Sequence, residues 1–498
     1  MELQFKKTTA PCLRMIAGGI QTREETQEIR LPDDMPDIGR VICCWGQVYV
    51  RSKEWRSDGV RISGGVTVWT LYAPDDGSAP RSVECWVPYQ ARWDYSESAR
   101  DGFVCVQPLL KSIDARSVSA KKLIVRVCVS LKGEALEPGQ WENSIAEEMP
   151  EDVQLLSNTY PVDIPSEAGE KLFQVEYEDG LPDAVLQTGR ILYYNANPVV
   201  AECKVMANRL VFRGNAAVHI LYRDDSEELK SLDVDMPFSQ YAELEREHSG
   251  SCTAKVLPLI TGIEFVMEEN RPILRCSVAA QYVIQDRQMV AVVEDGYSTK
   301  RNLQLERQTV SVPACLDSRS EQVNLEWDSG LRGVKVLDEF WLVSHPESLQ
   351  AGDSLQMTMP GVCQILYLDE EDRIQCQQGK MSAQWNFNSA SGNRVLPEIV
   401  MPQRPSFQNM GGTIQTELNY AVEMEIHSEL EMESVSAVQL GENLLPDPER
   451  PSLIVCRAGN TGLWELAKEN KTTVSAILAA NGLHEEPVMD QMVLVPLR

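Results

Sequence analysis

The chain has 498 residues, more than one hydrophobic core usually supports, so its length predicts three or four domains. Its formal net charge is -28 and no stretch concentrates Lys and Arg, which argues against nucleic acid as a partner. The 13 cysteines show no CxxC spacing, as is typical of thiols that serve as small hydrophobic side chains in a reducing compartment.

The N-terminal residues carry two lysines, at positions 6 and 7, but lead into no apolar segment of the kind that an export signal contains. Nowhere do about 18 uncharged apolar residues follow one another. We therefore expect a cytoplasmic protein without direct membrane insertion.

Three strand-like segments recur with a period near 150 residues, at Val66–Tyr72, Ala216–Tyr222 and Gly361–Tyr367. In each segment the residues in phase with the closing tyrosine are mostly apolar and the others are more mixed. A period of two is typical of a half-buried strand, so we expect each tyrosine to pack on the apolar face.

An acidic turn follows each segment, at residues 74–77, 224–227 and 369–372, and predicts a hairpin. Pro108 and Pro258 then stand at the same distance from the tyrosines, and further apolar strands follow them at matching distances. Chance does not keep such spacings, so they predict internal repetition.

These recurrences predict three tandem repeats, at residues 1–150, 151–305 and 306–440, of which the third has diverged. Short apolar runs between Gly, Pro and Asp predict a mainly β fold, each repeat being an antiparallel β-sandwich or a barrel. Because about 145 residues can bury a core, we expect the repeats to fold as independent domains.

Particular residues of these repeats resemble a known domain. They are the entry segment Leu31-Pro32-Asp33-Asp34-Met35-Pro36-Asp37-Ile38, the three strands that end in Leu-Tyr, and Met236-Pro237-Phe238. Together they resemble the SPOCS domain, named for SipL and spore coats, over roughly residues 1–440. The resemblance implies a β-rich fold and a role in spore-forming Firmicutes.

A proline-rich linker at residues 441–452 precedes a different unit at residues 453–498. There the pattern predicts a strand, a helix, a second helix and a return strand. Thr472 or Thr473 can cap the second helix, and Asn481-Gly482 is a typical helix end. The predicted order is βααβ.

This order, with Trp464 and Ala467 in register, is similar to a LysM domain. The resemblance implies a groove for N-acetylglucosamine chains, although the loop residues depart from the usual Gly-Asp-Thr-Leu. In SipL-like proteins it implies instead a protein partner, the morphogenetic ATPase that polymerises into the basement layer of the spore coat. The candidate groove residues are Gly459, Asn460, Thr461, Gly462, Leu463, Asn481, Gly482 and Leu483.

No pattern of catalytic chemistry stands out. The five histidines lack metal-ligand spacing, and GxGxxG, GxxxxGKS/T and the nucleophile elbow are missing from the sequence. Acidic pairs lie in turns, where solvated carboxylates are usual. We therefore predict a protein that is not an enzyme, without catalytic residues, metal or cofactor.

The sequence favours a scaffold or adaptor in endospore coat assembly, acting in the mother-cell cytoplasm at the forespore surface. Three similar copies suit a multivalent scaffold better than a catalyst. The alternative is a protein that binds peptidoglycan or cortex glycan through the LysM-like unit. A third possibility is a cell-wall hydrolase, which would need two carboxylates facing one cleft.

Overall fold

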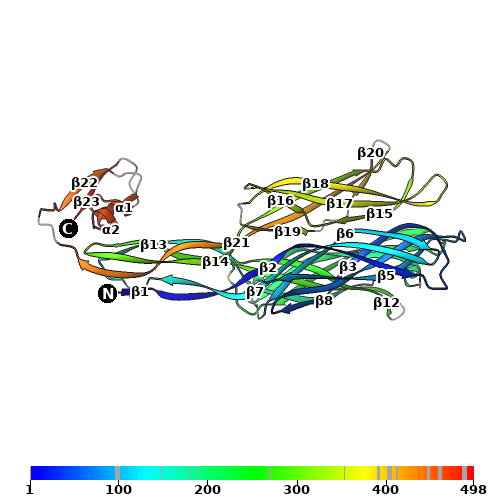
Figure 1. Ribbon diagram of the computed structural model, residues 1–498, viewed down its shortest axis with the longest axis horizontal. Helices are drawn as coiled ribbons and strands as arrows, with labels where there is room; N and C mark the ends of the chain where they lie inside the picture. Colours follow the sequence, from blue (N-terminus) through cyan, green and yellow to red (C-terminus); the bar gives the residue numbers. More distant parts are fainter. Residues whose placement is uncertain are drawn as a thin grey trace.

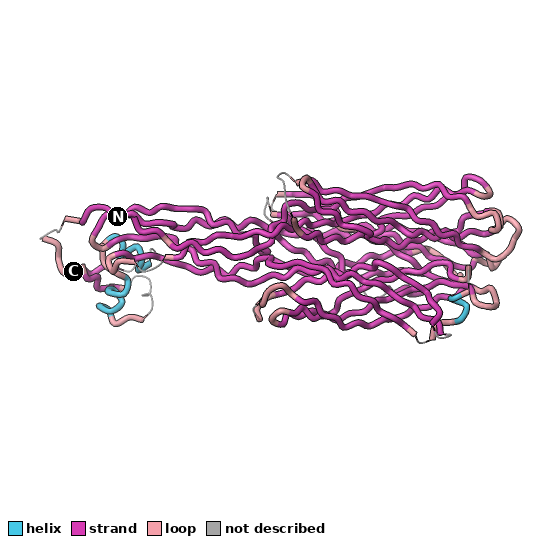
Figure 2. The backbone as a smooth tube through the Cα atoms, turned by 90° about the horizontal axis from the view of Figure 1, so that it is seen from below, coloured by secondary structure: helices cyan, strands magenta, loops and turns pink. Residues whose placement is uncertain are grey.

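The computed structural model is mainly β, with antiparallel pairing between its strands. It describes residues 2–95, 101–146, 149–178, 180–187, 189–248, 250–268, 271–352, 354–389, 393–400, 406–410, 413–445, 449–457, 462–484 and 491–497. Packed sheets form a broad body that narrows into a stalk, and a small helical unit lies at the far end of the stalk (Figure 1, Figure 2). In the described part of the chain, no helix is long and apolar enough to cross a membrane.

Six strands of the N-terminal part form two sheets that face each other, which we call the first β-unit. One sheet has the order β2 (Lys6–Arg30), β7 (Lys122–Ile145), β6 (Phe103–Ser119), and the other β3 (Ile38–Arg56), β4 (Gly59–Pro74), β5 (Arg81–Asp94). Alternate valines from both sheets fill the space between them, among them Val66 and Val127, which are fully buried.

The same connections recur further along the chain. The second β-unit pairs β8 (Val153–Tyr177), β13 (Arg271–Ser298) and β12 (Thr253–Glu268), and opposite them β9 (Ile191–Met206), β10 (Arg209–Arg223) and β11 (Leu229–Glu243), with the 3-10 helix η1 (Asp183–Leu186) before β9. The third β-unit has β14 (Arg301–Asp328), β21 (Thr413–Asn443), β19 (Arg394–Val400) and β20 (Ser406–Met410) in one sheet, and β15 (Lys335–Val343), β16 (Glu347–Ala351), β17 (Ser354–Leu368) and β18 (Ile374–Asn388) in the other. Each unit has its own core.

The three segments that end in Leu-Tyr lie in β4, β10 and β17, each the central strand of its sheet. They are buried on both faces, although the sequence predicted half-buried strands. The leucines Leu71, Leu221 and Leu366 point away from their own units into one cluster where all three units meet, and each is fully buried. We call this cluster the shared core.

Three aromatic rings, one from each unit, stack at the centre of the shared core. The ring centroid of Trp45 lies 4.4 Å from that of Phe340 and 5.1 Å from that of Tyr193. Tyr193 and Phe340 are themselves 5.1 Å apart in an edge-to-face arrangement. Such contacts stabilise the packing of the three units against one another. Independent folding of each repeat stays a prediction.

A second shared cluster fills the stalk. The long hairpins β2/β7, β8/β13 and β14/β21 contribute Cys12, Val162, Val292 and Val312, all buried between them. Figure 1 shows β13, β14 and β21 continuing into the stalk. The short strand β1 (Glu2–Gln4) pairs with β21, so the N-terminus of the described chain joins the third unit.

The closing tyrosines differ in burial. Tyr72 is fully buried and its hydroxyl donates to the Pro36 carbonyl at 3.0 Å, whereas Tyr222 and Tyr367 are partly buried. Gly214 lies at a β-bulge, where an added Cβ would stand 2.0 Å from the Val199 carbonyl oxygen. Any side chain there would force the two strands apart.

The C-terminal unit, which we call the module, has the order β22 (Leu453–Arg457), α1 (Gly462–Glu469), α2 (Val474–Asn481), β23 (Met492–Pro496). Of the two candidate caps, Thr473 is the N-cap of α2, since its side chain accepts a hydrogen bond from the Ala476 N–H. Gly482 ends the helix with a φ of 63°, the left-handed conformation that glycine adopts without strain.

The shared core predicts cooperative unfolding of the three units. Replacing Leu221 with Ala should cost about 2–5 kcal/mol, because it leaves a cavity against all three units. In calorimetry of the full chain, the transition that contains the three units should shift as one. Leu172, which is 65% exposed in the same unit, gives a matched Leu-to-Ala control that should change little. If the temperature of only one of several unfolding transitions fell, the three units would not unfold together, and this would contradict the shared core.

Candidate functional site

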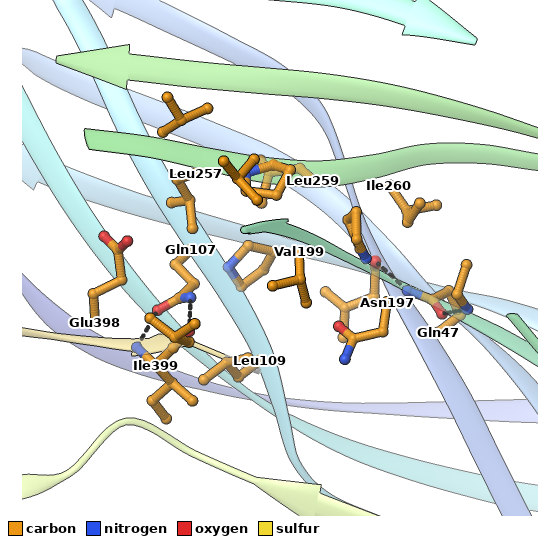
Figure 3. Close-up of a pocket in the computed structure, with 18 residues that line it drawn as sticks. Gln47, Gln107, Leu109, Asn197, Val199, Leu257, Leu259, Ile260, Glu398 and Ile399 are labelled. Atoms are coloured by element: carbon orange, nitrogen blue, oxygen red, sulfur yellow. Dashed lines mark hydrogen bonds between the residues drawn. The ribbon is translucent and has the colours of Figure 1, made fainter. Parts of the chain in front are cut away.

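A partly open cavity of about 140 Å³ lies where the three units meet (Figure 3). Its walls are residues 47–48 of β3, 107–109 of β6, 196–200 of β9, 256–260 of β12 and 398–400 of β19. The lining is mainly aliphatic, with the side chains of Gln47, Gln107 and Glu398 among it. A space of this size admits several water molecules or one small group.

Each of the five strands around the cavity pairs with one neighbour in its sheet, so among the described residues its other backbone edge is not paired within the sheet. Pro108, Pro198 and Pro258 lie on these edges and line the cavity. Proline has no N–H to offer an incoming strand, and edge prolines oppose strand addition. The edges of the cavity therefore oppose the addition of a peptide strand.

A chain of neutral hydrogen bonds crosses from the first unit to the third beside the cavity. His345 lies 2.9 Å from the Ser130 hydroxyl through Nδ1 and 3.0 Å from Gln107 Oε1 through Nε2. The Gln107 side chain also donates to the Ile399 carbonyl and accepts from the Ile399 N–H. Burial, with a smaller contribution from the Lys132 charge, lowers the pKa of His345 to about 3.

A buried group of charges, which we call the axial cluster, lies next to this chain. Lys132 binds Glu134 at 2.7 Å and Glu398 at 3.1 Å. Lys255 of the second unit binds Glu398 at 3.1 Å and Glu425 at 3.0 Å, so all three units take part.

The charges of the axial cluster compensate one another. Burial alone would lower the pKa of Lys255, but the carboxylates of Glu398 and Glu425 hold it well above its ordinary value. Burial alone would raise the pKa of Glu425, but Lys255 and the hydrogen bond from His427 lower it. The side chains of the cluster bind one another across the units, so the arrangement suits cohesion between units.

Among the described residues, no group of three or more His, Cys, Asp or Glu is placed to hold a metal ion. His219 lies half-buried on β10 and bridges two units. Its ring nitrogens lie 2.7 Å from Asp233 and 2.8 Å from Asp338. Burial alone would lower the pKa of His219, but these two carboxylates raise it to about 9.

The module holds the predicted groove residues, and Gly459, Asn460 and Thr461 among them lie outside the described residues. Gly462 begins α1 and Leu463 is buried in the core of the module. The Asn481 side chain binds the Leu494 N–H and carbonyl, each at 2.7 Å, so it ties α2 to β23. The exposed end of α2 is formed by Gly482 with the partly buried Leu483 beside it.

Sequence reasoning missed the axial cluster, although one signal was available. Lys132 and Glu134 interrupt an apolar strand, and both are buried. A buried Lys or Glu needs a partner of opposite charge, which here comes from the other units. The module also contacts Asp295 and Tyr297 of β13. No comparable pattern in the sequence marks these two residues as contact sites.

A model of the family described as SipL, SPOCS domain, matches residues 187–268, which span β9 to β12 of the second unit. No curated protein and no solved structure matches the chain. The family match supports the resemblance to SipL-like proteins over this segment. It suggests a role related to sporulation and the spore coat.

His345 predicts a loss of stability in acid. Its folded pKa is depressed, so the unfolded chain takes up a proton below about pH 6.5 while the folded protein does not until about pH 3. Between pH 7.5 and pH 5 the free energy of unfolding of the unmodified protein should fall by about 2 kcal/mol more than that of His345→Gln. Denaturant titrations at both pH values measure this, and parallel pH profiles would show that His345 titrates normally.

The axial cluster predicts a large effect of removing one charge. Lys132→Met should cost about 3–5 kcal/mol, because it leaves Glu134 and Glu398 buried with less compensation. Lys122 on the same strand pairs with Glu28 at the surface, so Lys122→Met should have little effect. Equal urea midpoints for the two variants would mean that the cluster adds nothing to cohesion.

Proposed function

We propose that the chain is a non-enzymatic scaffold in endospore coat assembly. In this proposal it links the ATPase of the coat basement layer to other coat components, through the module and the β-units. The family match at residues 187–268 is the observation that carries the proposal.

The first and third units support a repeated SPOCS-like architecture, since they repeat the strand connections of the matched second unit. Each also places a Leu-Tyr pair at the end of its central strand, with the leucine in the shared core. We propose that all three units are SPOCS-like repeats, the third divergent, and that their mutual contacts make them one rigid body.

We propose that the module is a LysM domain, a reading that the order β22, α1, α2, β23 supports. Its predicted groove lies between the loop before α1 and the end of α2. Among the described residues at this end, Leu463 and Asn481 make contacts inside the module, whereas Gly482 and His484 are exposed.

Non-enzymatic action is part of the proposal, as is a place in the mother-cell cytoplasm at the forespore surface. The engagement of the axial charges with one another supports a cohesive role over a catalytic one. The second candidate is peptidoglycan or cortex binding through the module, which the LysM-like element order favours.

Affinity capture from sporulating cells, run beside sedimentation with purified sacculi, separates the two candidates. The full chain should capture the coat ATPase, identified by mass spectrometry, and should stay in solution with sacculi. His484→Glu, at the exposed end of α2, should reduce capture by about tenfold or more, because it places a charge at the contact.

Ser475→Glu is the matched control, since Ser475 is also exposed but lies at the opposite end of α2. It should leave capture unchanged. Sedimentation with sacculi without capture of the ATPase would overturn the scaffold proposal in favour of glycan binding.

A further inference from the structure

The module contacts the end of the stalk through side chains of β13. The Asp295 carboxylate accepts a hydrogen bond from the indole N–H of Trp464 at 2.9 Å and another from the ammonium group of Lys468. The Tyr297 hydroxyl donates to the Thr472 carbonyl at 2.8 Å, and its ring lies edge-on to Trp464 with centroids 4.9 Å apart.

Tyr297 belongs to the core of the module although it lies in the stalk. It is 2% exposed and packs in the same buried cluster as Leu463, Ala467 and Ile477. The sequence predicted a linker at residues 441–452 followed by a different unit. In the structure this unit completes its core with a residue from β13.

A β-bulge sets the direction of these side chains. The pairing of β13 with β8 skips Glu294, since Val293 pairs with Ser157 and Asp295 with Leu156. A bulge re-aims the residues that follow it, and residues two apart on a strand then share a face. Asp295 and Tyr297 thus face the module together, while the Glu294 carboxylate binds the Tyr160 hydroxyl on the stalk.

The electrostatics of Asp295 match this docking. Burial alone would raise the pKa of its carboxyl, but the hydrogen bonds from Lys468 and Trp464 lower it. The Asp295 side chain is 17% exposed and that of Lys468 is 36% exposed. A charge-assisted pair in partly buried surroundings is stronger than a pair in open water.

We infer that Asp295 and Tyr297 form a socket on the stalk that binds the module of the same chain and fixes which of its ends faces a partner. The docked groups come from α1 and the turn before α2. Gly482 and His484, at the other end of α2, stay exposed. Access of a partner to this exposed end of α2 rests on the proposed function, whereas the docking of the module on Asp295 and Tyr297 does not.

The length of the linker favours the module of the same chain as the occupant. The Leu444 N–H still binds the Lys300 carbonyl at the stalk tip, and β22 begins at Leu453. The eight residues between them span at most about 30 Å. A tether of this length gives an effective concentration in about the millimolar range, far above that of a second copy.

Amide hydrogen exchange of the full chain tests the socket without any partner. In the double variant Asp295→Ala, Tyr297→Phe, the amides of α1 should lose protection by about tenfold or more, with β13 unchanged. The matched controls are Asp163→Ala, which removes a surface pair with Arg287, and Tyr160→Phe, which removes the bond to Glu294. Both should leave α1 protected, and unchanged protection in the double variant would overturn the socket.

If the double variant disturbs β13 itself, Lys468→Met provides the test, because it removes one docking contact from the module and leaves the residues of the stalk unchanged. Loss of α1 protection there supports the socket, and full protection overturns it. Dilution from about 50 µM to about 1 µM should not change protection. Protection that falls on dilution together with dissociation of a dimer would show that the socket holds the module of a second copy. Failure to capture the coat ATPase would leave all these outcomes unaffected.

Discussion

The contact of Trp45, Tyr193 and Phe340 at the centre of the body is the constraint on which the rest of the structure depends. One aromatic ring from each β-unit fills the same space, and Leu71, Leu221 and Leu366 surround them. Each unit therefore uses one face of the sheet that contains β4, β10 or β17 for its own core and the opposite face for the other two units. A strand of this kind has no solvent side, so large apolar surface is removed from water at both faces.

The shared core also limits how the protein can act as a scaffold. Equivalent faces of the three units cover each other, so they are not available as three equal binding sites. In the proposed scaffold the three units would therefore serve as one support and not as three equal sites for multivalent binding. The stalk extends this support, because its three hairpins pack on Cys12, Val162 and Val312. The module lies at the far end of this stalk (Figure 1).

Polar residues make the three units different where they meet. Lys132, Gln281 and Glu425 occupy corresponding positions in the three units. In each unit a proline of the neighbouring strand pairs with one residue, and the polar residue is the next one along the chain. Gln281 binds the backbone of Val106 in the first unit through both side-chain atoms, at 2.9 Å each. Three identical residues at this place would bring like charges together or leave donors without acceptors. The different residues complement each other, which favours one arrangement of the units.

The sequence by itself determined the local structure: the antiparallel β character, the strands that end in Leu-Tyr, the acidic hairpin turns, a threonine cap for α2 at Thr472 or Thr473, and its end at Gly482. These features depend on side-chain period and on turn and cap chemistry, which act within a few residues. Only the tertiary structure decided that Leu221 is buried, that Lys132 meets Glu398, and that Tyr297 enters the core of the module. Those contacts join residues far apart in the chain. A period of two gives the two faces of a strand but does not say what covers the second one, because that depends on the packing of the other units.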